Sequence, residues 1–240
     1  MNTAEFLTIT SSILPDRIAL VCGDNRSTYQ EMQERVNKLS NALQALGVQS
    51  GDKVASMDVN SIPYVETYYA CAKLGAIFVP LNYRAKNEEL IHMLNTAEAS
   101  VIFTGSRYIN LVEKIRPQLA ALRHIICYDA QKEGTTNYEA LLSEYEAIEI
   151  FTEVDDGDPT ILIYTSGTTA MPKGVALTYL SMSVYVTNTV EPATPEVHDV
   201  LLLSVPIFHV AGATAIMSSI LSGFSSFKIF FILEIYFIPI

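Results

Sequence analysis

Apolar residues along the chain follow two alternating spacings. Short runs rich in β-branched residues, such as residues 18–22, are typical of buried strands. Between these runs lie stretches with the spacing of a helix face. The clearest stretch places five apolar residues on one such face: Met32, Val36, Leu39, Leu43 and Leu46. This alternation predicts an α/β fold of parallel-rich sheets covered by helices.

Both ends of the helix in that stretch are marked in the sequence. Thr28 is placed to cap the first turn, and Glu31, three residues later, can bond back to the cap amide. Gly47 supplies the left-handed residue that often follows a helix. Residues 23–25 indicate a turn between the preceding strand and this helix.

The same spacings predict the later elements. Strands are expected at residues 54–57, 77–79, 101–104, 125–128, 161–164 and 201–203. Helices are expected from about Ser61 to Leu74, from about Asn87, and near Tyr138, Thr178 and Ala213. The acidic, turn-rich residues 153–159 predict a loop, and a subdomain seam would fall there.

Composition excludes some classes of protein. Half of the 240 residues are hydrophobic and only 17% are charged, which predicts a folded core rather than general disorder. Fifteen Lys and Arg against 26 Asp and Glu give a net charge of -11. A nucleic-acid partner is therefore not expected, because such binding relies on cationic patches.

The cysteines and histidines indicate neither disulfides nor a metal site. Cys22, Cys71 and Cys127 are far apart in apolar surroundings, so we expect buried, reduced thiols. These cysteines and the four histidines lack the close spacing of metal ligands. The first residues contain no secretory or transit pattern, and the predicted location is the cytoplasm.

The segment after the strand predicted at 161–164 carries the clearest chemistry. Residues 165–175 read Thr-Ser-Gly-Thr-Thr-Ala-Met-Pro-Lys-Gly-Val. Small residues let backbone N–H groups face an anion, hydroxyls add donors, and Lys173 adds a compact positive charge. The segment matches neither GxxxxGK[ST] nor GxGxxG. It predicts an exposed phosphate-binding loop, and composition alone also allows a plain surface loop.

This segment resembles the signature phosphate loop of the class I adenylate-forming superfamily. That superfamily includes acyl-CoA synthetases, luciferases and the amino-acid-adenylating domains of peptide synthetases. One departure is Ala170, where the family usually has Gly, so a positive φ there would be strained. The resemblance runs from near Phe6 to about Gly223, with supporting stretches at residues 28–54 and 73–84.

The resemblance implies an AMP-forming acid–thiol ligase that uses ATP, Mg²⁺ and coenzyme A with a carboxylic acid. The implied ATP phosphate-binding residues are Thr165, Ser166, Gly167, Thr168, Thr169 and Lys173. The implied acid pocket contains Phe208, His209 and Gly212, although a lone His in an apolar run is otherwise typical of a core residue. Amino-acid-adenylating domains typically have Asp where His209 stands, so an uncharged acyl or aryl acid is favoured.

Residues 1–223 are thus expected to be an incomplete N-terminal domain of an adenylate-forming enzyme. We locate no adenine-binding segment, ribose-binding Asp, hinge or C-terminal lid domain in this sequence. Residues 224–240 match nothing in the family, and a truncation or frameshift is expected to have produced an aberrant hydrophobic tail there.

Two alternatives remain open from the sequence. The tail is a candidate membrane anchor, but a spanning helix needs roughly 20 apolar residues, and Lys228 and Glu234 interrupt it, so no membrane partner is expected. The chain as a whole is either a truncated ligase, inactive alone, or a non-catalytic remnant that binds nucleotide weakly or not at all.

Overall fold

The computed structural model describes residues 1–165, 171–196 and 198–228. Its strands form two sheets. The four-stranded sheet has the order β10-β11-β1-β2, formed by Val200–Leu203, Ser225–Lys228, Ile18–Cys22 and Asn25–Thr28. The seven-stranded sheet has the order β7-β6-β5-β3-β4-β8-β9, formed by Thr136–Asn137, His124–Cys127, Val101–Thr104, Lys53–Met57, Ile77–Pro80, Pro159–Thr165 and Lys173–Thr178.

Parallel pairing dominates both sheets. Among the described strands only β1–β2 and β8–β9 pair antiparallel. The other pairs, including β3 with β4 and β5, and β11 with β1 and β10, are parallel. The predicted α/β fold with parallel-rich sheets is therefore confirmed.

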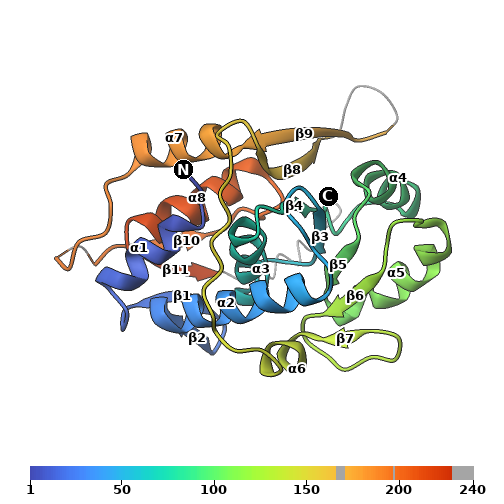
Figure 1. Cartoon of the computed structure of the whole chain (residues 1–240), viewed down its shortest axis with the longest axis horizontal. Coiled ribbons are helices and arrows are strands. Elements are labelled where there is room, and N and C mark those ends of the chain that lie inside the picture. The colour runs from blue at the N-terminus through green and yellow to red at the C-terminus, as the bar shows by residue number, and fades with distance from the viewer. Residues whose placement is uncertain (166–170, 197, 229–240) are drawn as a thin grey trace, which may run out of the picture.

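Helices cover both faces of the seven-stranded sheet (Figure 1). The described α-helices are α1 Glu5–Ile13, α2 Tyr29–Ala45, α3 Ile62–Lys73, α4 Asn87–Ala97, α5 Ile109–Ile115, α6 Tyr138–Ser143, α7 Tyr179–Thr189 and α8 Val210–Leu221. Successive strand residues point to opposite faces: Val54 belongs to the core that contains α2 and α3, and Ala55 to the core that contains α4 and α5. This arrangement explains the uninterrupted burial of the central strands.

The predicted ends of α2 are confirmed. The Glu31 amide donates to Thr28 Oγ1 at 3.1 Å, and the Thr28 amide donates to Glu31 Oε2 at 2.8 Å, which completes a capping box. Gly47 has a φ of 85° after the helix, as predicted. The turn before the helix is shorter than predicted, because Asn25 already begins β2.

Several elements escaped the sequence analysis, notably α1, α5, β2, β7 and β9. The strand β9 is exposed over most of its length, so no burial pattern marks it. It forms because its backbone pairs with β8 at the edge of the sheet. The predicted phosphate loop therefore connects the two strands of a hairpin.

The predicted start of the tail is wrong for residues 225–228. They form β11, which lies between β10 and β1 with Ser226 opposite Leu20. The Ser225 hydroxyl donates to the Ile18 carbonyl at 2.6 Å, so β11 is part of the folded sheet. The rest of the tail, residues 229–240, lies outside the described residues. Within the part that is described, no helix is long and apolar enough to cross a membrane.

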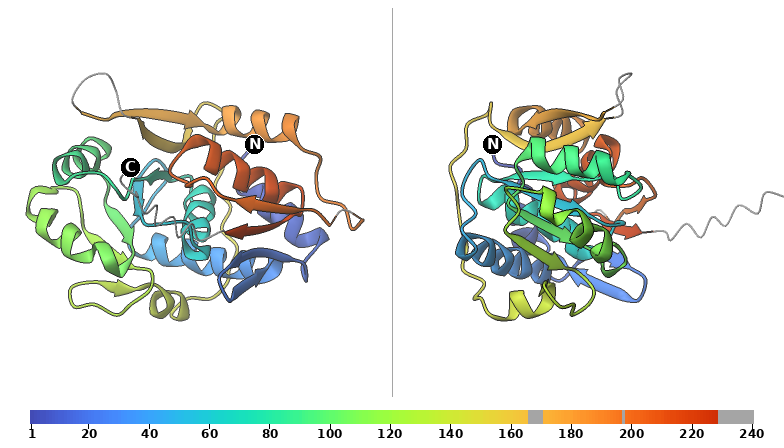
Figure 2. Two further views of the ribbon diagram at one scale, coloured as in Figure 1. Left: turned by 180° about the vertical axis from the view of Figure 1, so that it is seen from behind. Right: turned by 90° about the vertical axis from the view of Figure 1, so that its right-hand side faces the viewer.

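The acidic segment at 153–159 leads into β8 of the seven-stranded sheet. Residues 144–158 contain no helix or strand and run along the surface from α6 to β8 (Figures 1 and 2). The strand β8 then joins the same sheet as β4, where Ile161 pairs with Phe78. The predicted loop is confirmed, and the sheet is continuous across it.

Candidate functional site

The β8–β9 hairpin carries the predicted phosphate loop. Thr165, the last residue of β8, pairs with Lys173, the first residue of β9, and the Thr165 hydroxyl donates to the Lys173 carbonyl at 3.5 Å. Both residues are exposed, as predicted for the ends of the loop. The predicted residues Ser166, Gly167, Thr168 and Thr169 lie outside the described residues, as does Ala170.

Helix α4 supports both stems of this hairpin. The Tyr164 hydroxyl donates to the Met93 carbonyl at 2.9 Å and lies 2.7 Å from Thr96 Oγ1. On the other stem, His92 Nε2 lies 3.1 Å from the Pro172 carbonyl oxygen. Partial burial raises the pKa of Tyr164, so its phenol stays neutral and remains a donor at neutral pH.

A pocket of about 680 Å³ opens beside the hairpin. The hairpin contributes Thr165 and Pro172, α4 contributes Met93, and the segment before α8 contributes Phe208 and His209. Further apolar lining comes from Ala85, Ile163, Val175, Leu177, Val205, Val210 and Ala211. The fold thus brings one end of the predicted phosphate loop and two of the predicted acid-pocket residues to one cavity.

The segment before α8 is held by a residue that the sequence analysis missed. Asn60 donates from Nδ2 to the Val205 carbonyl at 2.9 Å and accepts from the Ile207 amide at 2.9 Å. No motif marks an isolated Asn so far away in sequence. Phe208 is buried and packs edge-on against Tyr83, with ring centroids 5.5 Å apart.

The remaining predicted pocket residues differ in exposure. His209 is exposed and occupies the N-cap position of α8. Gly212 is buried and is absent from the pocket lining. A Cβ on Gly212 would lie 2.3 Å from the Pro206 carbonyl oxygen, so this glycine allows α8 to pack against its own entry segment.

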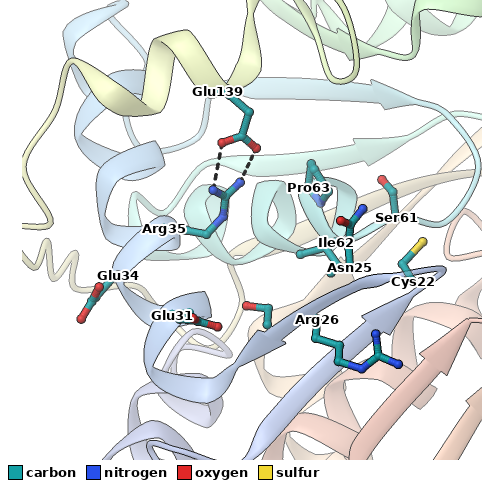
Figure 3. A pocket seen from close by; sticks show the side chains of 11 residues that line it. Cys22, Asn25, Arg26, Glu31, Glu34, Arg35, Ser61, Ile62, Pro63 and Glu139 are labelled. Atoms are coloured by element: carbon teal, nitrogen blue, oxygen red, sulfur yellow. Dashed lines mark hydrogen bonds and ion pairs between the residues drawn. The ribbon is translucent and has the colours of Figure 1, made fainter.

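A second pocket, of about 460 Å³, lies between the β1–β2 hairpin and the start of α3 (Figure 3). It contains none of the predicted site residues. The Arg35 guanidinium there donates to the buried Glu66 and to the exposed Glu139, each at a shortest distance of 2.7 Å. The Tyr138 hydroxyl also donates to Glu66, at 2.6 Å. Complete burial raises the pKa of Glu66, and the bonds from Arg35 and Tyr138 offset part of this effect.

The described residues contain no group of three His, Cys, Asp or Glu side chains that could hold a metal ion. The sequence of residues 165–173 supplies hydroxyls and one lysine, which are donors suited to phosphate oxygens.

Fold and pocket together define an α/β protein with a lysine-bearing hairpin beside an apolar cavity. The family model described as AMP-binding enzyme matches residues 10–227. The chain therefore belongs to the AMP-binding enzyme family.

Among curated relatives, the chain is similar to the indoleacetate–CoA ligase of Aromatoleum aromaticum, with 31% identity over 213 residues, 88% of this chain and 42% of the relative. It is also similar to the long-chain-fatty-acid–CoA ligase of Thermus thermophilus, with 34% identity over 189 residues, 78% of this chain and 34% of the relative. The chain thus spans about two fifths or less of the length of these two relatives.

Solved structures confirm the fold. The N-terminal domain of FACL13 from Mycobacterium tuberculosis, crystallised with an inhibitor, matches with a TM-score of 0.86 at 29% identity. The match covers 95% of this chain and 57% of that domain. The anthranilate CoA ligase AuaEII in complex with anthranoyl-AMP also has a TM-score of 0.86, at 24% identity, and covers 96% of this chain and 45% of that one. The described fold is that of the N-terminal part of adenylate-forming enzymes.

Proposed function

We propose that this chain carries the phosphate-binding and acid-binding part of an AMP-forming acid–thiol ligase. In such a ligase a carboxylate attacks the α-phosphate of ATP, which forms an acyl-adenylate and releases pyrophosphate. A thiol, here coenzyme A, then attacks the acyl carbon and releases AMP. The observation that supports this proposal best is the cavity shared by Thr165, Phe208 and His209.

The hairpin residues take the ATP phosphates in this proposal. The hydroxyls of Thr165, Ser166, Thr168 and Thr169, the Gly167 amide and the Lys173 ammonium would bind the β- and γ-phosphates of MgATP. Negative charge develops on the departing pyrophosphate, and Lys173 would stabilise it more in the transition state than in the bound substrate.

The cavity next to the hairpin takes the acid. Apolar side chains such as Val175, Leu177 and Phe208 favour an uncharged acyl or aryl group. The names of the two curated relatives, an indoleacetate and a long-chain-fatty-acid ligase, support this class of acid. His209 would shape the pocket wall without binding a substrate ammonium.

A second candidate function is nucleotide binding without catalysis by the 240-residue chain alone. It is supported by the short share of the ligases that the chain spans, 42% and 34% of the two curated relatives.

We also propose the cytoplasm as the compartment, since Cys22, Cys71 and Cys127 are all free thiols.

Equilibrium binding of MgATP tests the role of the hairpin. Lys173→Ala should weaken binding by about tenfold or more, because a charge-assisted hydrogen bond to phosphate is worth roughly 1.5–3 kcal/mol. Lys132→Ala, which changes another exposed lysine, is the matched control and should bind as the wild type does. Circular dichroism should be unchanged in both variants. Wild-type chain without MgATP affinity, or a Lys173→Ala variant with full affinity, would contradict the proposal.

A further inference from the structure

We propose that His92 is a positioning residue of the phosphate loop, holding the stem that leads into Lys173; this inference rests on the proposed function. His92 lies half-buried on α4, with Nε2 at 3.1 Å from the carbonyl oxygen of Pro172. A carbonyl oxygen only accepts, so Nε2 carries the proton and donates. The neutral ring is therefore the Nε2–H tautomer.

The His92 contact is made with the residue directly before Lys173. Pro172 directly precedes Lys173, and proline has no backbone N–H. Its carbonyl is the single backbone polar group through which neighbouring side chains can hold it. His92 uses this group, and the bond fixes the backbone from which the Lys173 side chain extends.

The same helix fixes the opposite stem one residue before Thr165. Tyr164 bonds to the Met93 carbonyl and to the Thr96 hydroxyl. Residues 92–96 of α4 therefore contact both Tyr164 and Pro172, one on each stem of the hairpin. Between the stems, the Thr165 hydroxyl reaches the Lys173 carbonyl only at 3.5 Å, which is a weak bond. Backbone pairing of β8 with β9 sets the spacing of the stems, and α4 adds side-chain bonds that hold the residue before Thr165 and the residue before Lys173.

Positioning matters here because lysine is long and flexible. A fixed backbone reduces the ordering cost of bringing its ammonium to a phosphate, and that saving appears as affinity. Losing one neutral hydrogen bond that supports the stem should weaken MgATP binding by about two- to tenfold.

The experiment compares His92→Leu, which removes the donor, with His92→Gln, whose terminal amide restores an N–H at similar reach. His198→Leu, which changes an exposed histidine outside the site, is the matched control. In the intact 240-residue chain, amide hydrogen exchange of residues 173–175 and the Kd for MgATP are measured together with the thermal midpoint. We expect faster exchange and weaker binding in His92→Leu, recovery of both in His92→Gln, and wild-type values in His198→Leu.

The two readouts separate failure of this inference from failure of the proposed function. Unchanged exchange in His92→Leu overturns the inference, whether or not MgATP binds. If the wild type binds MgATP, and His92→Leu exchanges faster but binds MgATP with the same Kd, the inference is also overturned. The contact is then only structural. A wild type that does not bind MgATP overturns the proposed function and, with it, a role for His92 in phosphate binding.

Discussion

Arg35 links two carboxylates that differ in their surroundings. Glu66 is fully buried, whereas the Glu139 side chain is 59% exposed, and the two form equally short bonds to the same guanidinium. Water already solvates Glu139, so its bond adds little, but a buried carboxylate without a partner is costly. The geometry alone would rank the two bonds as equal, and burial decides which one stabilises the fold.

We therefore predict that Arg35→Met lowers the free energy of unfolding by about 3–5 kcal/mol, since it leaves Glu66 buried without its cation. Glu139→Gln, which breaks the exposed bond to the same Arg35, should cost less than about 1 kcal/mol. Urea unfolding at neutral pH measures both. Equal losses in the two variants would show that burial does not control this cluster.

The Arg35→Met loss should also depend on pH. Burial raises the folded-state pKa of Glu66, and removing Arg35 raises it further. An acid with a higher pKa in the folded state binds its proton more tightly when folded. The contribution of Glu66 to the free energy of unfolding is therefore greatest below its unfolded pKa of about 4.3. It is lost as the pH rises through the folded pKa. Adding Glu66→Gln to Arg35→Met should remove this extra pH dependence in the same urea titrations.

Among the elements, strand β11 shows that the folded part of the chain reaches at least to Lys228. It is the inner partner of both β1 and β10, and the Tyr29 hydroxyl donates to the Phe224 carbonyl at its entry, at 2.7 Å. Without β11, the strand β10 has no partner among the described strands. The apolar composition that predicts an aberrant tail therefore begins inside a native strand.

A pair of truncations tests this boundary. A chain ending at Lys228 should keep a single cooperative thermal transition, and one ending at Phe224 should lose it, because β1 and β10 lose their common partner. Removing residues 229–240 should also raise solubility, since that sequence is rich in aromatic and β-branched residues with one charge. Circular dichroism melts and solubility after centrifugation measure the two effects. Equal melting of the two truncated chains would contradict the role given to β11.

At the scale of the whole molecule, binding and catalysis are separate requirements. The cavity beside the hairpin brings one end of the phosphate loop and the apolar wall together. Catalysis also needs the carboxylate held in line with the α-phosphate, and such orientation can contribute roughly 7–11 kcal/mol to lowering a barrier. The 240-residue chain spans 57% of the FACL13 N-terminal domain that it matches.

We predict that the purified chain does not catalyse acid-dependent exchange of labelled pyrophosphate into ATP. The assay offers indoleacetate and a long-chain fatty acid, the acids named for the two relatives, and uses the Thermus thermophilus ligase as the positive control. Binding of MgATP without exchange is the expected result. Exchange well above background with either acid would show that these residues suffice for adenylate formation.

Local sequence patterns were enough to predict the α/β class, the ends of α2 and the loop that resembles that of the adenylate-forming family. These features depend on local spacing: apolar periodicity, a Thr28–Glu31 cap and a run of small and hydroxyl residues are all readable within a few positions. A prediction from periodicity could therefore find central strands such as β5 within one residue of their observed ends.

Which distant residues lie together, in contrast, became known only from the tertiary contacts. Strand β9 exists because β8 pairs with it, Asn60 holds the segment before Phe208, and α4 brings His92 to Pro172. The close approach of Gly212 to the Pro206 carbonyl is likewise a tertiary contact. The physical reason is that these contacts join residues whose separation in space depends on the whole sheet, and no local pattern records a bond between positions 80 or 147 residues apart.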